Sequence, residues 1–176
     1  QLVANAQAAV DELRRRGVAG RVAIGGHSYG AYMSACLLAH SDIFSAAVCR
    51  SGAYNRLLTP FGFQSEERTL WEARDVYMNM TPLLFADKVK APMLLVHGVE
   101  DNNAGTFPMQ SERMFQALQG LGKAARLVML PLESHSYPAR ESILHVLWET
   151  GAWLRRPLPG PAAAAAAEPT QAAAGK

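Results

Sequence analysis

The chain has 176 residues, of which 49% are hydrophobic and 18% are charged, and its 17 basic and 15 acidic residues give a net charge of +2. This length suits a single domain and leaves no room for a second sizeable core. The absence of a basic run argues against a nucleic-acid partner, and apolar runs of about five or six residues are far shorter than the roughly 20 residues of a membrane-spanning helix.

The first third of the chain predicts two helices and two strands. Apolar residues at helical spacing, closed by three arginines before Gly17, predict a helix at the start. A buried strand is expected at residues 21–24, a helix at about 29–40 and another strand at 46–49. Because the pattern opens inside a helix, without an initiator Met, a signal peptide or a transit peptide, we expect a fragment of a longer protein.

The remaining elements predict the fold class. Prolines and crowded aromatic residues break the pattern over residues 52–90, where we expect short helices and loops. Buried strands follow at 93–97 and 126–130, and helices at about 107–118 and 138–154. This alternation predicts an α/β fold in which helices cover both faces of a mainly parallel sheet.

The end of the chain differs in composition from the rest. We expect residues 1–156 to form part of one catalytic domain and the Pro/Ala-rich residues 157–176 to form a disordered tail. Cys36 and Cys49 lie in apolar surroundings and are expected to be buried free thiols.

A candidate nucleophile lies in the pentapeptide Gly26–Gly30, which has the pattern G-x-S-x-G between a predicted strand and a predicted helix. That context is typical of a nucleophile elbow, which exposes the hydroxyl of Ser28 above the sheet. We expect side chains at positions 26 and 30 to collide with the neighbouring strand and helix. The backbone N–H of Tyr29 and the N-terminal dipole of the helix would then face a developing oxyanion.

A serine nucleophile needs a histidine base that is oriented by a carboxylate, and the chain order in this fold is Ser, then Asp or Glu, then His. Asp101 and its competitor Glu100 follow the strand at 93–97, and His135 lies on a loop after the next strand. His145 falls in an apolar helix, where we expect a buried core histidine. His27 lies in the elbow, where its side chain should point away from the serine. His40 ends a predicted helix, and His97 ends a predicted strand. The spacing shows no metal-ligand cluster, so we expect no metal and no cofactor.

Several segments resemble a known family, the prolyl oligopeptidase family of serine peptidases: residues 25–33, 97–101 and 133–135. In that family the acid follows the strand in a His-Gly-x-x-Asp pattern, which matches Asp101 rather than Glu100. More particular segments resemble the glutamyl endopeptidase branch known from plant chloroplasts: residues 50–56, 59–64, 68–73, 100–103 and 145–150.

The resemblance implies more than the residues alone. It implies an α/β-hydrolase that cleaves peptides after glutamate through Ser28, Asp101 and His135 and an acyl-enzyme. It also implies an upstream propeller and an upstream part of the catalytic domain, from which a tyrosine supplies the second oxyanion donor. The implied location is the chloroplast stroma in a plant or alga, and the cytoplasm otherwise.

Arginine binds carboxylates well, so a glutamate pocket predicts an arginine. Arg56 is the first candidate and Arg50 the second, because both follow a strand end on a loop that lines the first specificity pocket in related peptidases. The alternative is that Arg56 pairs with a nearby acid: Glu66, Glu67 or Glu72. Asn103 matches a family position that contacts the substrate backbone, or is a turn residue. Three aromatic residues either line the pocket or, as we expect, join the core: Tyr54, Phe61 and Trp71.

Two alternatives to a glutamyl peptidase stay open. The same triad serves acylaminoacyl-peptidases and esterases, because a fold does not fix the substrate. A partial sheet would also expose an edge and an apolar face, so the chain could be catalytically incomplete without its upstream half.

Overall fold

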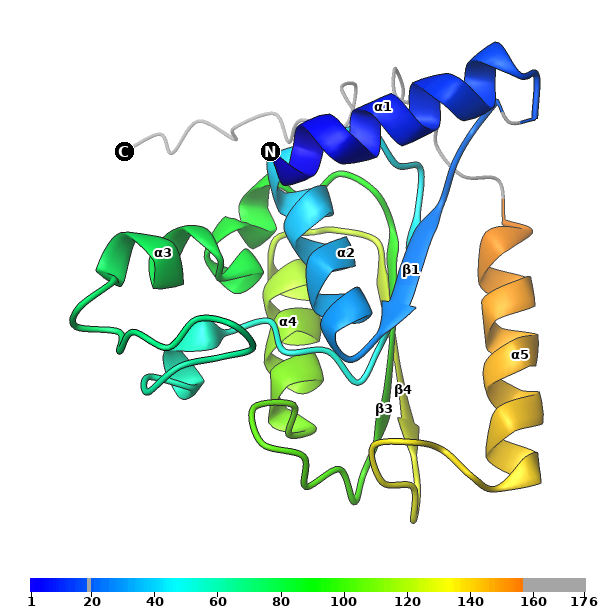
Figure 1. Ribbon diagram of the computed structural model, residues 1–176. Helices are drawn as coiled ribbons and strands as arrows, with labels where there is room; N and C mark the ends of the chain where they lie inside the picture. The colour runs from blue at the N-terminus through cyan, green and yellow to red at the C-terminus, as the bar shows by residue number, and fades with distance from the viewer. Residues whose placement is uncertain (19, 157–176) are drawn as a thin grey trace, which may run out of the picture.

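The computed structural model describes residues 1–18 and 20–156, and the tail predicted at 157–176 lies outside these residues. A parallel sheet forms the centre of the described part (Figure 1). Its strands lie side by side in chain order: β1 (Ile24–His27), β2 (Ala47–Arg50), β3 (Met93–Gly98) and β4 (Ala125–Leu130). Because all of them run in the same direction, their carboxyl ends meet at one edge of the sheet, where ligands bind in open α/β sheets.

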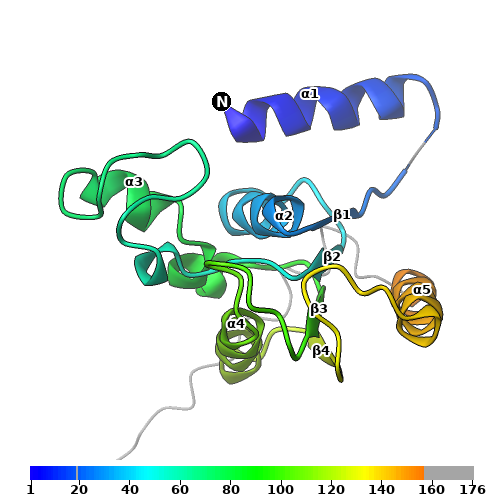
Figure 2. The ribbon, with the colours of Figure 1, turned by 60° about the horizontal axis from the view of Figure 1, so that its bottom comes forward.

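Helices cover both faces of the sheet, as the sequence predicted. Figure 2 shows α2 and α4 on one face and α5 on the other, with α1 outside α2. The long helices are α1 (Leu2–Arg15), α2 (Tyr29–His40), α4 (Met109–Gly120) and α5 (Arg140–Leu154). The segment after β2 contains the expected short helices: η1 (Arg56–Leu58), α3 (Arg74–Asn79) and η2 (Pro82–Lys88). No helix in the described part of the chain is long and apolar enough to cross a membrane.

The first strand lies further along the chain than predicted. It spans Ile24–His27 instead of residues 21–24, because it pairs with β2 in the register Ile24 to Ala47 and His27 to Arg50. A Cβ atom at Gly25 would lie 2.8 Å from the carbonyl oxygen of Val48. The glycines therefore belong to the strand itself, where they permit a close approach of the neighbouring backbone.

Alternate residues of the strands supply two hydrophobic clusters, one on each face of the sheet. In β3, Met93 and Leu95 face α2 and α4, while Leu94 and Val96 face α5. Cys36 and Cys49 are buried free thiols, as predicted. Burial raises the pKa of each thiol to about 12, so both are protonated at neutral pH and unreactive.

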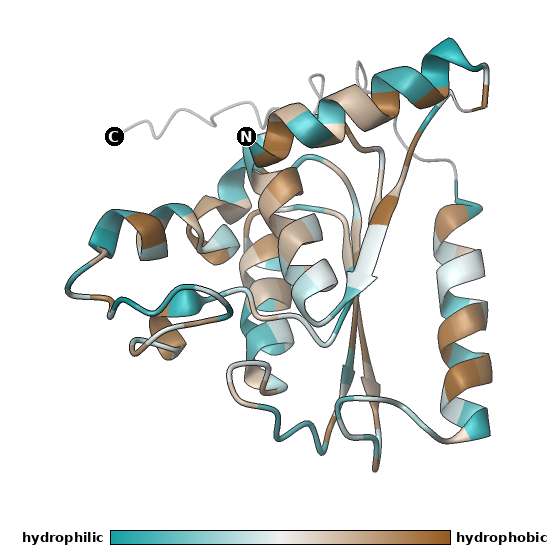
Figure 3. Cartoon of the chain, in the orientation of Figure 1, coloured by the Kyte–Doolittle hydropathy of each residue, from teal (hydrophilic) through white to brown (hydrophobic). Residues whose placement is uncertain are grey.

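One side of α5 is apolar and exposed, and Figure 3 shows its hydrophobic bands. Large hydrophobic side chains between 45% and 62% exposed gather there: Ile143, Leu144, Leu147 and Trp148. The prediction that His145 is a core histidine is wrong, because its side chain is 50% exposed and its ring stacks on Trp148. The helix faces the core through Val146, Glu149 and Trp153, and position 145 lies outside that stripe.

Candidate active site

A sharp turn joins β1 to α2 at Ser28. The serine has φ 55° and ψ −116°, a conformation that a residue with a side chain seldom adopts. Its N–H donates to the carbonyl oxygen of Arg50 at 2.8 Å, and its own carbonyl accepts from Tyr32, so the turn is tied to both β2 and α2. These bonds hold the strained serine between a strand and a helix, which is the geometry of a nucleophile elbow.

The two outer glycines of the elbow have different roles. A Cβ atom at Gly26 would lie 2.4 Å from the backbone carbon of Gly30, so only glycine fits at position 26. The same expectation for Gly30 is wrong, because a Cβ atom there meets nothing within 4 Å among the described residues. Gly30 limits the residue at position 26 through its backbone.

The first turn of α2 carries free backbone donors. The first four N–H groups of an α-helix have no carbonyl partner within the helix, and Tyr29 is the first residue of α2. The first backbone hydrogen bond of the helix runs from the N–H of Tyr32 to the carbonyl oxygen of Ser28, at 3.1 Å. The N–H of Tyr29, the residue that follows Ser28 in the chain, therefore lies at the positive end of the helix dipole.

Asp101 and His135 meet on neighbouring loops. Nδ1 of His135, on the loop after β4, lies 2.8 Å from Oδ2 of Asp101, on the loop after β3. The loops come together because His135 follows a segment that passes over Gly98, where a Cβ atom would lie 2.3 Å from the carbonyl oxygens of Glu133 and Ser134. The carboxylate that meets His135 belongs to Asp101, whereas Glu100 is exposed.

The carboxylate of Asp101 is buried and accepts several hydrogen bonds. Burial pushes its pKa up, but the bond from His135 and the backbone N–H of Asn103 outweigh this, and the net pKa is lowered. Oδ1 accepts from the Asn103 N–H at 3.0 Å, while Oδ2 is 2.8 Å from His135 and 3.0 Å from His97. Asp101 is therefore a carboxylate at neutral pH, and Nδ1 of His135 must carry a proton to bond with it.

His27 connects the elbow with the loop of His135. The two rings form an edge-to-face contact with centroids 4.9 Å apart, and the ring of Tyr137 lies 5.3 Å from that of His27. Burial lowers the pKa of His27, and the proximity of His135 and Arg50 lowers it further. Ser28 follows His27 directly in the chain, so this contact brings the backbone of the elbow close to the loop of His135.

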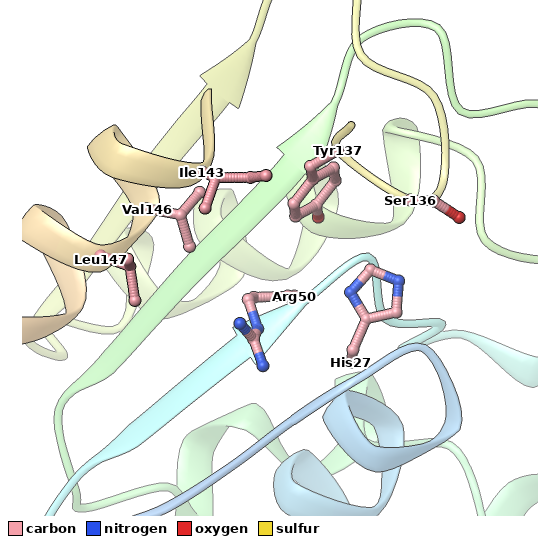
Figure 4. A pocket seen from close by; sticks show the side chains of 7 residues that line it. All are labelled: His27, Arg50, Ser136, Tyr137, Ile143, Val146 and Leu147. Carbon is pink, nitrogen blue, oxygen red and sulfur yellow. The ribbon is translucent and has the colours of Figure 1, made fainter. Parts of the chain in front are cut away.

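A pocket of about 440 Å³ lies behind His27, between the end of β2 and α5. Figure 4 shows its lining residues: His27, Arg50, Ser136, Tyr137, Ile143, Val146 and Leu147. Arg50 points into this space, and its buried Nε has no hydrogen-bond partner in the described chain. The second candidate for binding glutamate therefore lies in a pocket that α5 borders.

Arg56 occupies a different environment. It begins η1 and is 5% exposed, and its guanidinium carbon lies 3.9 Å from the ring centre of Tyr32 and 4.6 Å from that of Phe63. No acid within residues 1–18 and 20–156 pairs with it, and its Nε lacks a hydrogen-bond partner. Two of the three acids weighed as partners bond elsewhere, since Glu66 pairs with Arg68 and Glu72 with Thr69, and the third, Glu67, is exposed.

The remaining predicted contact residues lie in a loop, in the core and at the surface. Asn103 is a turn residue that donates its N–H to Asp101 and its side-chain amide to Thr106. Tyr54 is buried, as predicted, but the expectation of a core position is wrong for Phe61 and Trp71, which are 78% and 58% exposed and pack on each other. No group of three or more His, Cys, Asp or Glu side chains gathers within the described residues to form a metal site.

Sequence reasoning missed two histidines that border the site. His97 was seen only as the end of a strand, yet it bonds to Asp101, and His27 was given no role, yet it packs on His135. A signal for His97 existed, because a polar residue at the end of an otherwise apolar buried strand needs a hydrogen-bond partner.

A parallel sheet with a serine elbow after one strand, an acid loop after a later strand and a histidine loop after the last is the α/β-hydrolase arrangement. Solved structures share it. The fold is similar to Porphyromonas gingivalis dipeptidyl peptidase 4, with a TM-score of 0.77 and 18% identity, over 87% of this chain and 22% of that one. It is also similar to Pyrococcus horikoshii acylaminoacyl peptidase, with a TM-score of 0.63 and 28% identity, over 82% and 25% of the two chains.

The sequence comparisons narrow this class to a family. The family model described as the prolyl oligopeptidase family matches residues 1–160. A probable chloroplastic glutamyl endopeptidase of Arabidopsis thaliana is 63% identical over 159 residues, and one of Oryza sativa subsp. japonica is 60% identical over 159 residues. In both cases the match covers 89% of this chain and 17% of the relative. The chain belongs to the prolyl oligopeptidase family of serine peptidases.

Proposed function

We propose that this chain carries the catalytic residues of a serine endopeptidase that cleaves peptides after glutamate. The chain spans 17% of the length of the two plant relatives, so the activity of the whole protein is part of this proposal. The observation that carries it is the hydrogen bond of 2.8 Å between His135 and Asp101 beside the serine elbow. A buried carboxylate, a partly exposed imidazole and a strained serine together support acyl transfer rather than a binding role.

In the proposed mechanism, Ser28 Oγ attacks the carbonyl carbon of the scissile peptide bond while Nε2 of His135 accepts its proton. Nε2 is free to accept because Nδ1 holds its proton toward Asp101. The oxyanion accepts a hydrogen bond from the N–H of Tyr29. The amine then leaves with the proton from His135, and an acyl-enzyme ester remains on Ser28. A water molecule, deprotonated by His135, attacks this ester and releases the carboxylate product and the serine.

The proposed glutamate specificity rests on Arg56. The guanidinium lies on the ring of Tyr32, whose backbone is about one helical turn beyond Ser28 on α2. A buried arginine without an acidic partner is costly unless a ligand supplies the negative charge. A glutamate side chain does so, and aromatic walls would pack on its methylene groups. Arg50 is the second candidate for this role, and a contact of Asn103 with the substrate backbone is proposed from the family resemblance alone.

The names of the two plant relatives also support a location. Both are called chloroplastic, and we propose the chloroplast stroma as the site of action if the source is a plant or an alga, and the cytoplasm otherwise. Their greater length is consistent with an upstream propeller and an upstream part of the catalytic domain. We propose that these parts supply the second oxyanion donor and restrict access to peptides.

A panel of otherwise identical peptides tests the specificity. Each peptide carries glutamate, glutamine, leucine or an N-acetylated residue before the scissile bond, and kcat/KM is compared between the parent chain and Arg56→Leu. The proposal predicts that the parent prefers glutamate and that Arg56→Leu loses this preference. The matched control is Arg68→Leu, because Arg68 is an exposed arginine that pairs with Glu66. A preference for the N-acetylated peptides would indicate an acylaminoacyl-peptidase instead, and a glutamate preference that survives Arg56→Leu would exclude Arg56.

A further inference from the structure

His97 is a second histidine bound to the proposed catalytic acid. It lies near the end of β3, and its side chain is completely buried. Its Nε2 lies 3.0 Å from Oδ2 of Asp101 and 2.6 Å from the carbonyl oxygen of Thr106, and its Nδ1 lies 2.6 Å from Oγ of Ser111 in α4. Oδ2 of Asp101 therefore touches both His97 and His135.

The neighbours of His97 determine which nitrogen carries the proton. Nε2 faces a carboxylate oxygen and a carbonyl oxygen, and both of these atoms only accept hydrogen bonds. Nε2 must therefore be the protonated nitrogen. Burial lowers the pKa of His97, which keeps the ring neutral, so Nδ1 accepts a hydrogen bond from the hydroxyl of Ser111. The result is a fixed chain of hydrogen bonds from Ser111 through His97 to Asp101.

We propose that His97 is a positioning residue that holds the carboxylate of Asp101 in the orientation required by His135. This inference rests on the proposed triad and extends it by one member. Its Nε2–H is shared between the carbonyl oxygen of Thr106 at 2.6 Å and, at 3.0 Å, the oxygen of Asp101 that also accepts from His135. His97 itself exchanges no proton with the substrate.

The other contacts of Asp101 do not replace this bond. Oδ1 is held by the N–H of Asn103 at 3.0 Å and, more weakly, by the hydroxyl of Thr106 at 3.4 Å. Oδ2 is held by the two histidines, of which His135 has a side chain that is 24% exposed and must stay free to react. Without His97, the only donor to Oδ2 among these contacts is the base that the carboxylate has to orient. The sheet and α4 thus fix the acid through His97.

Two substitutions at position 97 separate positioning from simple space filling. The amide of His97→Gln has two hydrogens for the two acceptor oxygens, whereas His97→Phe keeps a ring and loses both nitrogens. We expect His97→Phe to slow labelling of Ser28 by a fluorophosphonate about 10- to 100-fold, since a hydrogen bond to a charged group is lost, and His97→Gln to recover most of the rate. The matched control is Glu149→Gln, a buried polar change on α5, far along the chain from the acid loop.

A second readout does not depend on catalysis. The proton on Nδ1 of His135 gives a low-field NMR signal when it bonds to Asp101, and we expect this signal to persist in His97→Gln and to weaken or move in His97→Phe. If the parent chain takes no fluorophosphonate label, the proposed function is in question, but the NMR comparison still decides the role of His97. Should His97→Phe fail to fold, Ser111→Ala takes its place, because it removes the donor to Nδ1 and is expected to broaden the same signal.

Equal labelling rates, or an unchanged Nδ1 signal, in folded His97→Phe would overturn the inference. Equal losses in His97→Gln and His97→Phe would overturn it as well, because they would mean that only the shape of the ring matters. For Ser111→Ala, an Nδ1 signal identical to that of the parent would have the same meaning.

Discussion

His135 and Asp101 lie 34 positions apart in the chain, on the loops after adjacent strands, yet Nδ1 of the first is 2.8 Å from Oδ2 of the second. The contact exists because β3 and β4 are parallel neighbours, so that their following loops leave the same edge of the sheet. Gly98, at the end of β3, lets the loop of His135 cross closely enough to complete the bond. The contact between His135 and Asp101 therefore depends on the parallel pairing of β3 with β4 and on the glycine at position 98.

The acid loop offers a matched pair of substitutions. Asp101→Asn is expected to slow fluorophosphonate labelling of Ser28 about 10³- to 10⁴-fold, because an amide cannot hold the imidazole in the reactive tautomer. Glu100→Gln, at the exposed neighbouring position, is expected to leave the rate unchanged. The second-order labelling rate measures both effects. Loss of rate in Glu100→Gln with retention in Asp101→Asn would reverse the assignment.

The elbow glycine predicts a stability effect. In Gly26→Ala the added Cβ atom would lie 2.4 Å from the backbone of Gly30, and relieving this overlap is expected to lower the free energy of unfolding by about 2–3 kcal/mol. In the control Gly120→Ala, the Cβ atom meets nothing within 4 Å at the end of α4, and stability is expected to stay constant or rise slightly. Urea denaturation measures both values, and similar losses would show that the crowding at Gly26 is unimportant.

Sequence patterns predicted much of the fold, because the order of apolar strands and amphipathic helices along the chain determines how the sheet is built. Apolar runs marked β2, β3 and β4, and their order with the helices predicted a parallel sheet. The position of β1 was missed because its residues are glycines, which join the strand only through pairing with Val48. The spacing of apolar residues also does not show which side of a helix packs against the sheet. For this reason the apolar sequence around His145 predicted a core position that the structure does not have.

The site was predicted unevenly for similar reasons. Motif order predicted Ser28 and His135 and left Asp101 and Glu100 as alternatives for the acid, between which the family resemblance favoured Asp101. A motif contains no information on neighbours from other elements. His97 bonds to Asp101 through a loop that returns to the strand end, and Arg56 stacks on Tyr32 of another helix. Loop arginines usually pair with nearby acids, and here stacking between two aromatic rings took the place of an ion pair.

Two histidines, the buried His97 and the partly buried His27, predict how stability depends on pH. Burial lowers the pKa of His97, and it lowers the pKa of His27 together with the proximity of His135 and Arg50. A histidine in the unfolded chain has a pKa of about 6.5 and so binds protons that the folded chain excludes. The free energy of unfolding is therefore greatest above about pH 6.5 and falls as the pH drops below it.

The substitution His97→Gln tests this dependence. It is expected to reduce the slope of unfolding free energy against pH between about pH 6.5 and pH 5, since one of the two titrating groups is gone. Denaturation in urea at several pH values measures the slope, and Glu149→Gln is a control that retains both histidines. A slope identical to that of the parent would mean that His97 is already protonated in the folded chain.

The apolar face of α5 predicts self-association. Leu147 is 62% exposed and lies beside Leu144 and Trp148, and such a patch favours contact with another apolar surface. Leu147→Lys is expected to reduce concentration-dependent association in sedimentation velocity experiments. Leu132→Lys changes a leucine that is 87% exposed on a loop and should have no effect. Equal effects of the two substitutions would point to added charge rather than to the face of α5.

The most direct test of the proposed triad is the site of fluorophosphonate labelling in the 176-residue chain. The chain, shown to be folded by circular dichroism, is exposed to the probe beside Ser28→Ala, and the modified residue is located by mass spectrometry. We expect one label, on Ser28, that is absent from Ser28→Ala. A label on another residue, a label that persists in Ser28→Ala, or a folded chain that takes no label would contradict the claim that these residues form a competent nucleophile.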